Sequence, residues 1–253
     1  MRTVTSREHT NREYEQELRR LREQLLLMGA KVEEIIRGSI RALTERETAV
    51  AEQMIAFDKK INQLELEIDE LCMQILARRQ PVASDLRFIT MALKLVTDLE
   101  RIGDLGVNIC ERVVELNEEA PLQPVGDLTN LADEAIALVH DALDALVARD
   151  VDKAKALLGR DAIIDEHYGQ IFRGVLDLMA REPTAVYRAT RVQSIAKYLE
   201  RIADHAVNIA ETVVFLVKGT DIRHHQSRQY ESDHPPPLAG SHRNGADGNG
   251  QRK

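Results

Sequence analysis

The sequence predicts an all-α protein of six helices in two similar halves, followed by a C-terminal tail. Three observations support this prediction. Aromatic residues make up only 4% of the chain, Trp is absent, and the 253 residues include only 13 Gly and 7 Pro, which favours helices. Apolar residues recur every three or four positions over long segments, as in amphipathic helices. A motif at residues 99–111 returns at residues 199–211, which indicates a duplicated unit.

The first half contains three expected helices. Apolar residues at helical spacing span residues 7–46, and a second periodic segment covers residues 47–79. Gln80 ends this segment because a residue that precedes proline avoids the α region. A third helix begins near Pro81, which suits the first turn of a helix, and continues until residues 118–126 interrupt the pattern.

The second half repeats this order with a shorter opening helix at residues 127–149. Asp150 has the side chain of a helix N-cap, and the fifth helix runs from there to about residue 181. Pro183 begins the sixth helix, and Gly219 stands where that helix is expected to stop.

These elements predict two units and a tail. The first unit covers residues 7–120 and the second covers residues 125–219. After about Asp221 the chain is rich in His, Ser, Pro, Gly and charged residues, which bury too little apolar surface to fold. We therefore expect residues 221–253 to be disordered.

The composition also restricts the function. A net charge of −8 argues against general nucleic-acid binding, which needs a basic face. No apolar run approaches the roughly 18 residues of a membrane span, and the N-terminus is too polar for a signal peptide. The two cysteines, Cys72 and Cys110, fit a reducing compartment better than a disulfide framework. We therefore expect a cytoplasmic protein.

The repeated motif places acidic residues on one face of a helix. Glu100, Asp104, Asn108 and Glu111 fall within an arc of about 80° at 3.6 residues per turn. Apolar residues flank this stripe and also cover the opposite side of the helix, so we expect the helix to be largely buried with its carboxylates. The second copy, from Glu200 onward, repeats the stripe.

Buried carboxylates need compensation. An ionised carboxylate in apolar surroundings costs several kcal/mol unless a cation or a hydrogen-bond donor meets it. Arg101 and Arg201 lie about 100° around the helix from the glutamates that precede them, so neither covers its neighbour squarely. A bound metal or a partner helix is the more economical explanation.

Facing helices offer further acidic residues. Asp58 and Asn62 lie four residues apart on the second helix, and Asp161 and Asp165 occupy the matching positions on the fifth. Carboxylate oxygens suit Mg²⁺, Mn²⁺, Ca²⁺ or iron. Zinc fits less well because no Cys and His cluster has ligand spacing. The Glu-x-x-His pairs of di-iron bundles are also absent, which argues against oxygen chemistry.

A simpler reading of the stripe remains open. The acidic and amide side chains could be buried polar contacts that fix the register of the helices without any ligand. His205 is expected to be a packed or capping side chain, because Leu105 occupies its place in the first half. Asp85 and Arg87 could be a charge pair at the start of the third helix, and they have no clear equivalent in the second half.

The motifs together resemble a known family. Pro81-Val82-Ala83-x-Asp85-Leu86-Arg87 is followed by Leu99-Glu100-Arg101-Ile102-Gly103-Asp104 and by a second copy, Leu199-Glu200-Arg201-Ile202-Ala203-Asp204. This combination is similar to the PhoU family of phosphate-signalling and phosphate-transport accessory proteins. The resemblance covers about residues 18–219 and leaves out the tail.

The resemblance implies a fold, a location and partners. It implies two tandem three-helix bundles related by a pseudo-twofold axis, in a cytoplasmic protein that forms a homodimer. The implied partners are the ATPase subunit of a phosphate ABC transporter and a phosphate-sensing histidine kinase, so that contact with the membrane is indirect. Asp85 and Arg87 are the residues we assign to partner docking.

The resemblance also implies a multinuclear metal site. Iron is the first expectation, with manganese, magnesium or zinc as the other candidates. The expected ligands are acidic residues of the repeated motif and of the facing helices: Glu100, Asp104, Glu200, Asp204, Asp58, Asp161 and Asp165. Asn62 replaces a carboxylate at the position that matches Asp165, so equal occupancy of the two halves is not expected.

The predicted function is regulatory, not enzymatic. No nucleophile with an adjacent base and no glycine-rich phosphate loop appears. We expect a negative regulator that holds the transporter and the kinase in their phosphate-replete states. Two alternatives remain: a carboxylate-bridged metalloenzyme that acts on a phosphorylated compound, and a metal-free helical adaptor whose carboxylates pair with the arginines of a partner.

Overall fold

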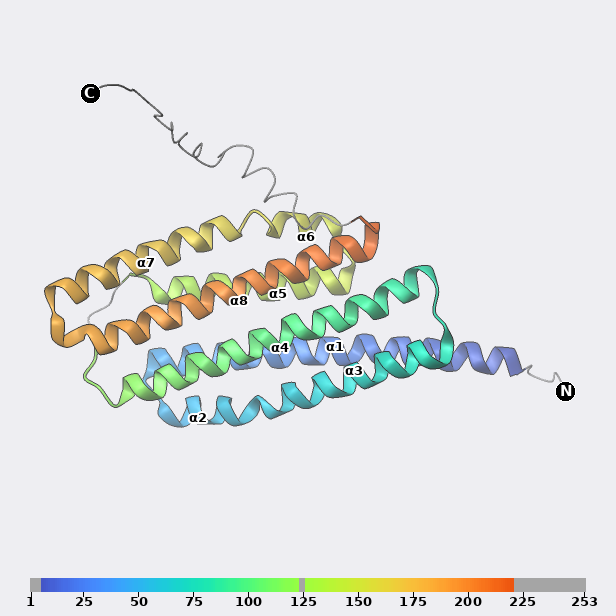
Figure 1. The fold of residues 1–253 in the computed structure, drawn as a ribbon, viewed down its shortest axis with the longest axis horizontal. Helices are drawn as coiled ribbons and strands as arrows, with labels where there is room; N and C mark the ends of the chain where they lie inside the picture. The colour runs from blue at the N-terminus through green and yellow to red at the C-terminus, as the bar shows by residue number, and fades with distance from the viewer. Residues whose placement is uncertain (1–5, 123–125, 221–253) are drawn as a thin grey trace, which may run out of the picture. The chain divides into compact units, whose positions relative to one another are not determined.

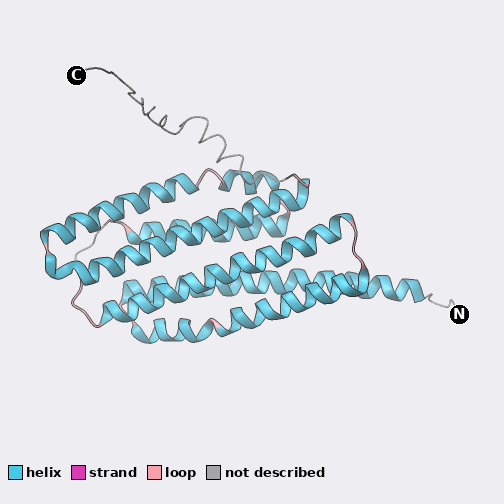
Figure 2. Cartoon of the chain, in the orientation of Figure 1, coloured by secondary structure: helices cyan, strands magenta, loops and turns pink. Residues whose placement is uncertain are grey.

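The computed structural model describes residues 6–122 and 126–220, and all regular structure in these ranges is helical (Figure 2). The helices are α1 (Ser6–Glu45), α2 (Thr48–Phe57), α3 (Lys59–Arg79), α4 (Ala83–Asn117), α5 (Leu128–Ala148), α6 (Val151–Leu157), α7 (Asp161–Arg181) and α8 (Val186–Lys218), with a 3₁₀ turn at Pro183–Ala185. The all-α class with six helices is confirmed, since α2 with α3 and α6 with α7 are two interrupted helices. The predicted tail at 221–253 lies outside the described residues.

The helices form two halves that meet along α4 and α8. Figure 1 shows α4 and α8 side by side, with α1, α2 and α3 next to α4 and with α5, α6 and α7 next to α8. The contact between α4 and α8 is the largest between any two of these helices, and α1 also touches α5. The exact unit boundaries at 7–120 and 125–219 stay a prediction.

The cores of α4 and α8 have the same register. Leu95, Ile102 and Ile109 of α4 are completely buried, as are Ile195, Ile202 and Ile209 of α8, exactly 100 positions later. A spacing of seven residues keeps each set on one face of its helix. These buried apolar residues occupy one face of each helix. The acidic residues of the motif lie on the neighbouring face, which points toward the interrupted helices α2–α3 and α6–α7.

Two predicted helices are interrupted where continuous helices were expected. The second helix breaks at Asp58, and the fifth breaks over residues 158–160, just before Asp161. In the first break the carbonyl of Asp58 accepts hydrogen bonds from the amides of Ile61 and Asn62. Asp and Gly are poor residues for a helix interior, and Gly159 lies in the second break. The first interruption lies at Asp58 and the second lies just before Asp161, and both residues are predicted metal ligands.

The ends of the helices follow local rules. The Asp150 carboxylate accepts hydrogen bonds from the amides of Asp152 and Lys153, which confirms the predicted N-cap. Gly219 ends α8 with a left-handed φ of 71°, as a C-terminal glycine does. The third helix begins at Ala83, two residues after Pro81, because Gln80 is left-handed and Pro81 and Val82 are non-helical.

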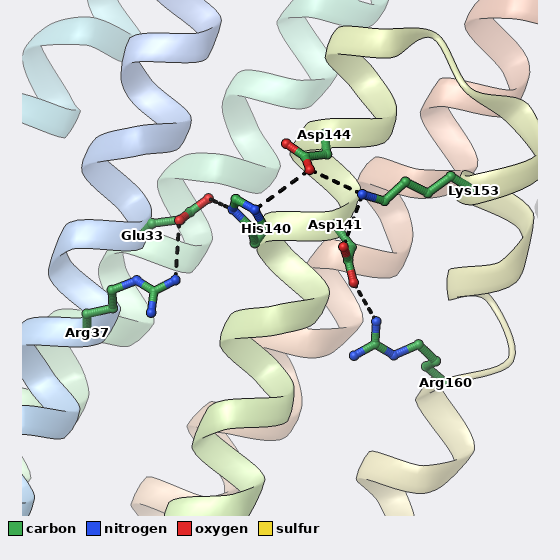
Figure 3. A network of polar contacts seen from close by, with 7 residues as sticks. All are labelled: Glu33, Arg37, His140, Asp141, Asp144, Lys153 and Arg160. Carbon is green, nitrogen blue, oxygen red and sulfur yellow. Dashed lines mark hydrogen bonds and ion pairs between the residues drawn. The ribbon is translucent and has the colours of Figure 1, made fainter.

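A polar network also joins the halves (Figure 3). His140 of α5 lies between Glu33 of α1, 3.0 Å away, and Asp144, 3.7 Å away. Lys153 continues the network from Asp144 to Asp141, which also pairs with Arg160 at 2.7 Å. These contacts tie α1 to α5, and α5 to α6 and the second break.

No helix in the ranges that the structure describes combines the length and the apolar character needed to cross a bilayer.

Candidate functional site

The acidic stripes are buried less than expected. Glu200 is 8% exposed and the Glu100 side chain is 18% exposed, but the Asp104 side chain is 41% exposed and Asp204 is also exposed. The expectation that all the carboxylates are buried is therefore wrong. Four like charges cannot be withdrawn from water together without compensation, so the glutamates turn inward and the aspartates stay at the edge.

The first acidic cluster consists of Asp58, Glu65, Glu100 and Asp104. Asp58 lies at the break between α2 and α3, Glu65 lies two turns further along α3, and the other two residues come from α4. A methyl group at residue 103 would lie 3.1 Å from Ile61 Cδ1 and 3.5 Å from Asp58 Oδ1. Gly103 therefore allows the broken helix to approach α4 closely.

Three carboxyl groups of the first acidic cluster have raised pKa values. Burial raises the pKa of Glu100 from 4.5 to about 7, and the charge of Asp104 adds to the rise. Burial also raises the pKa of Asp58, which the hydrogen bond from Asn62 partly opposes, and the pKa of Glu65. All three shifts favour the protonated carboxyl.

Arg101 contacts the first acidic cluster more closely than predicted. Its guanidinium lies 3.5 Å from Glu100 and 3.6 Å from Asp104, so it bridges two carboxylates. The flexible side chain overcomes the angle of about 100° between neighbouring residues on the helix. Because the Arg101 side chain is 56% exposed, water screens these ion pairs, and the pKa of Glu100 stays raised.

The second acidic cluster consists of Asp161, Asp165, Glu200 and Asp204. Asp161 and Asp165 lie in the first turns of α7, just after the second break, and the other two residues come from α8. Partial burial raises the pKa of Asp204 from 3.8 to about 6, and repulsion from Glu200 and Asp161 adds to the rise. Burial likewise raises the pKa of Asp161, with Asp165 and Glu200 contributing.

A lysine that sequence reasoning missed enters the second acidic cluster. Lys197 Nζ lies 2.6 Å from Glu200 Oε2 and 5.2 Å from the centre of the Tyr168 ring. Its position three residues before Glu200 is a signal that a helical wheel could have provided. The ammonium group thus meets the most buried carboxylate of this cluster.

The donor atoms of both clusters fit a hard cation. Asp58 Oδ1 and Asp161 Oδ1, which occupy matching positions in the two halves, are buried and have no hydrogen-bond partner. Carboxylate oxygens of this kind suit Mg²⁺, Mn²⁺ or iron. Within residues 6–122 and 126–220, no three acidic, His or Cys side chains already stand close enough together to hold one metal ion. A metal ion would be held there only after these side chains rotated toward each other.

A separate polar contact crosses the interface between α4 and α8. His205 Nδ1 lies 3.0 Å from Asp98 Oδ1, and the Asn208 amide donates to the same oxygen at 3.4 Å. The Asp98 and His205 side chains are 10% and 19% exposed, so this is a packed histidine, as expected. The sequence did not indicate Asp98, because Tyr198 replaces it in the second copy of the motif.

The two residues assigned to docking have partners within the protein. Asp85 accepts a hydrogen bond of 2.9 Å from the Tyr14 hydroxyl, and burial together with this bond raises the pKa of Tyr14 to about 12. Arg87 donates to the Leu216 carbonyl at 3.4 Å and lies over the Phe215 ring. Both side chains therefore contribute to intramolecular packing, at the starts of α1 and α4 and at the end of α8.

Known proteins share this arrangement of helices. A crystal structure of PhoU from Pseudomonas aeruginosa superimposes with a TM-score of 0.79 and 39% identity, covering 82% of this chain and 100% of that one. The phosphate transport system regulatory protein PhoU from Streptococcus pneumoniae gives a TM-score of 0.77 and 29% identity over 83% and 99% of the two chains. Both likenesses therefore extend over nearly the whole described part of the chain.

Sequence comparison gives the same result. The PhoU homologue of Pseudomonas putida, named a phosphate-specific transport system accessory protein, is 41% identical over 85% of each chain. The accessory protein PhoU of Escherichia coli is 33% identical over 88% of this chain and 93% of its own. The family model of the PhoU domain matches residues 25–113 and again 128–213. With two PhoU domains, one in each half, the chain belongs to the PhoU family.

Proposed function

We propose that this protein is an accessory regulator of phosphate transport that restrains the phosphate-starvation response when phosphate is plentiful. The observation that carries the proposal is the pair of PhoU domains. Relatives at 33–41% identity over most of both chains are named accessory proteins of phosphate-specific transport systems. That name also supports a regulatory role and not an enzymatic one.

The proposed partners are the ATPase subunit of the phosphate transporter and a phosphate-sensing histidine kinase. We further propose that the protein is cytoplasmic, acts as a homodimer and reaches the membrane only through these partners. Asp85 and Arg87 remain the residues assigned to docking. Because both hold intramolecular contacts, a partner would have to compete with Tyr14 for Asp85 or with the Leu216 carbonyl for Arg87.

We propose that the acidic clusters bind hard metal ions. Asp58, Glu100 and Asp104 would hold a metal in the first half, and Asp161, Asp165, Glu200 and Asp204 would do so in the second. A bound divalent cation would supply the positive charge that these carboxylates lack. The chain itself contributes the two unpartnered oxygens of Asp58 and Asp161 and the raised carboxyl pKa values around them.

A deletion strain tests the regulatory proposal. Removing the gene should leave a reporter of phosphate-starvation genes active in phosphate-rich medium, and the wild-type gene supplied in trans should restore repression. Normal repression in the deletion strain would contradict the proposal. Two-hybrid or co-purification measurements against the ATPase subunit and the kinase, with and without Arg87→Ala, then test the docking assignment.

Metal content tests the role of the clusters. Untagged protein should contain iron, manganese or another hard metal in amounts that fall in part in Glu100→Ala/Asp104→Ala and in part in Glu200→Ala/Asp204→Ala. A folded wild type that takes up no metal would favour the helical adaptor whose carboxylates meet the arginines of a partner. Turnover of a phosphoester that both double variants abolish would favour the metalloenzyme.

A further inference from the structure

Besides Asn62, which stands where the second half has Asp165, two further positions beside the acidic clusters differ between the halves. Thr97 of α4 corresponds to Lys197 of α8 at the offset of 100 residues that relates the two motifs. Glu65 of α3 corresponds to Tyr168 of α7 at the offset of 103 that relates Asp58 to Asp161. At these two positions the first half has an acidic residue, Glu65, and a neutral one, Thr97. The second half has an aromatic residue and a lysine there.

Lys197 is held in place from two sides. Its ammonium group lies 2.6 Å from Glu200 Oε2 and 5.2 Å from the Tyr168 ring centre, within range of a cation–π interaction. The Glu200 side chain is 11% exposed and the Lys197 side chain is 43% exposed, so the carboxylate end of this ion pair is nearly buried while the ammonium end contacts water. Water therefore reaches this pair mainly from the side of Lys197, and screens it less than a pair whose two partners are both exposed.

The first acidic cluster has no equivalent of this contact. The Thr97 hydroxyl donates to the Leu93 carbonyl of its own helix at 3.2 Å and brings no charge. The cation that reaches Glu100 and Asp104 is Arg101, whose ion pairs measure 3.5 and 3.6 Å and whose side chain is 56% exposed. The carboxylates in these pairs are 18% and 41% exposed, against 11% for Glu200, so the longer pairs of Arg101 are the weaker ones.

We propose that Lys197 is a resident cation of the second acidic cluster and makes this cluster the weaker of the two divalent-cation sites. The inference rests on the proposed binding of metal by both clusters. A metal ion that enters the second half has to displace an ammonium group 2.6 Å from Glu200, whereas one that enters the first half displaces a guanidinium that lies 3.5 and 3.6 Å from its carboxylates. Divalent cations therefore fill the first acidic cluster before the second.

Mn²⁺ titration of the full-length protein tests the proposal, with free Mn²⁺ followed by electron paramagnetic resonance. Glu100→Ala/Asp104→Ala isolates the second cluster, and Glu200→Ala/Asp204→Ala isolates the first. Adding Lys197→Thr to the first of these backgrounds should tighten Mn²⁺ binding about ten-fold, which corresponds to about 1.4 kcal/mol. Adding Thr97→Lys to the other background should weaken binding by a similar factor. Lys197→Arg, which keeps the charge, is the matched control and should stay close to its parent.

The outcomes separate this proposal from the one on which it rests. Binding to the second cluster that is unchanged in Lys197→Thr would overturn the role of Lys197 and leave metal binding intact. A protein that binds Mn²⁺ in neither half, with or without Lys197, would overturn both. Tighter binding in Lys197→Thr that Lys197→Arg reproduces would also overturn the proposal, because charge would then not be the cause.

Thermal unfolding gives a second readout that does not depend on resolving the two sites. In a chelator, Lys197→Thr should unfold at a lower temperature than the wild type, because Glu200 loses its cation. Saturating Mn²⁺ should then raise the Tm of Lys197→Thr more than it raises the Tm of the wild type. Equal increases in the two proteins would contradict a resident cation.

Discussion

Replacing Glu100 by Gln should stabilise the metal-free protein at alkaline pH. In the folded state the pKa of this carboxyl is about 7 instead of 4.5, so folding disfavours its ionised form. Between these two pH values the folded state binds more protons than the unfolded state, and the free energy of unfolding therefore falls as the pH rises. Glu100→Gln removes this loss, because an amide does not ionise.

The magnitude follows from the pKa. A rise from 4.5 to about 7 corresponds to about 3 kcal/mol at about 1.4 kcal/mol per pKa unit. Losing the ion pair with the exposed Arg101 costs the variant less than about 1 kcal/mol. We therefore expect Glu100→Gln to be more stable than the wild type by about 1–3 kcal/mol at pH 8, and equally stable or slightly less stable at pH 4.

Urea denaturation in a chelator, followed by circular dichroism from pH 4 to pH 8, measures this difference. Glu52→Gln, at an exposed position of α2, is the matched control and should follow the wild type at every pH. The reasoning is refuted if Glu100→Gln is destabilised by the same amount at pH 4 and pH 8, since the glutamate would then act through its shape or hydrogen bonds and not through its charge.

Three further substitutions test packing and polar contacts outside the two acidic clusters, each by urea denaturation. Gly219→Ala should cost about 1 kcal/mol, because φ is 71° and the new Cβ would lie 2.9 Å from Arg87 Nη1. Asp98→Ala should cost about 1–3 kcal/mol, because His205 and the Asn208 amide lose their common acceptor. Asp141→Asn should cost about 0.5–1 kcal/mol at pH 7. The pKa of Asp141 is lowered overall, because the rise caused by burial is outweighed by the hydrogen bonds from Lys153 and Arg160. This cost should therefore vanish in acid, where the wild-type carboxyl becomes protonated.

Helical periodicity was sufficient to predict most of the fold. The apolar face of each long helix is the face that the structure buries, as the matching positions of Ile102 and Ile202 show. The N-cap at Asp150 and the stop at Gly219 were also predictable, because each depends on one side chain and its own backbone. The interruptions at Asp58 and at residues 158–160 were not, because apolar residues keep their helical spacing on both sides of each break.

The candidate site was only partly predictable. The sequence indicated Glu100, Asp104 and Asp58, because their spacing within each helix is fixed and the motif is duplicated. Side-chain exposure was not predictable, since it depends on how far α4 and the broken helix are apart. Glu65 and Lys197 were missed for a related reason: they differ between the halves, and a search for repeated residues passes over them.

The electrostatics of the clusters connect stability to the proposed function. A carboxylate held at a raised pKa lowers the stability of the folded protein at neutral pH, and a cation that binds there recovers that free energy. The same recovery is available to a metal ion, to Lys197 or to an arginine of a partner, so these compete for the same oxygens. Lys197 already pairs with Glu200 in the second acidic cluster. Cation binding should therefore stabilise the folded protein more at the first cluster, at Glu100 and Asp104, than at the second.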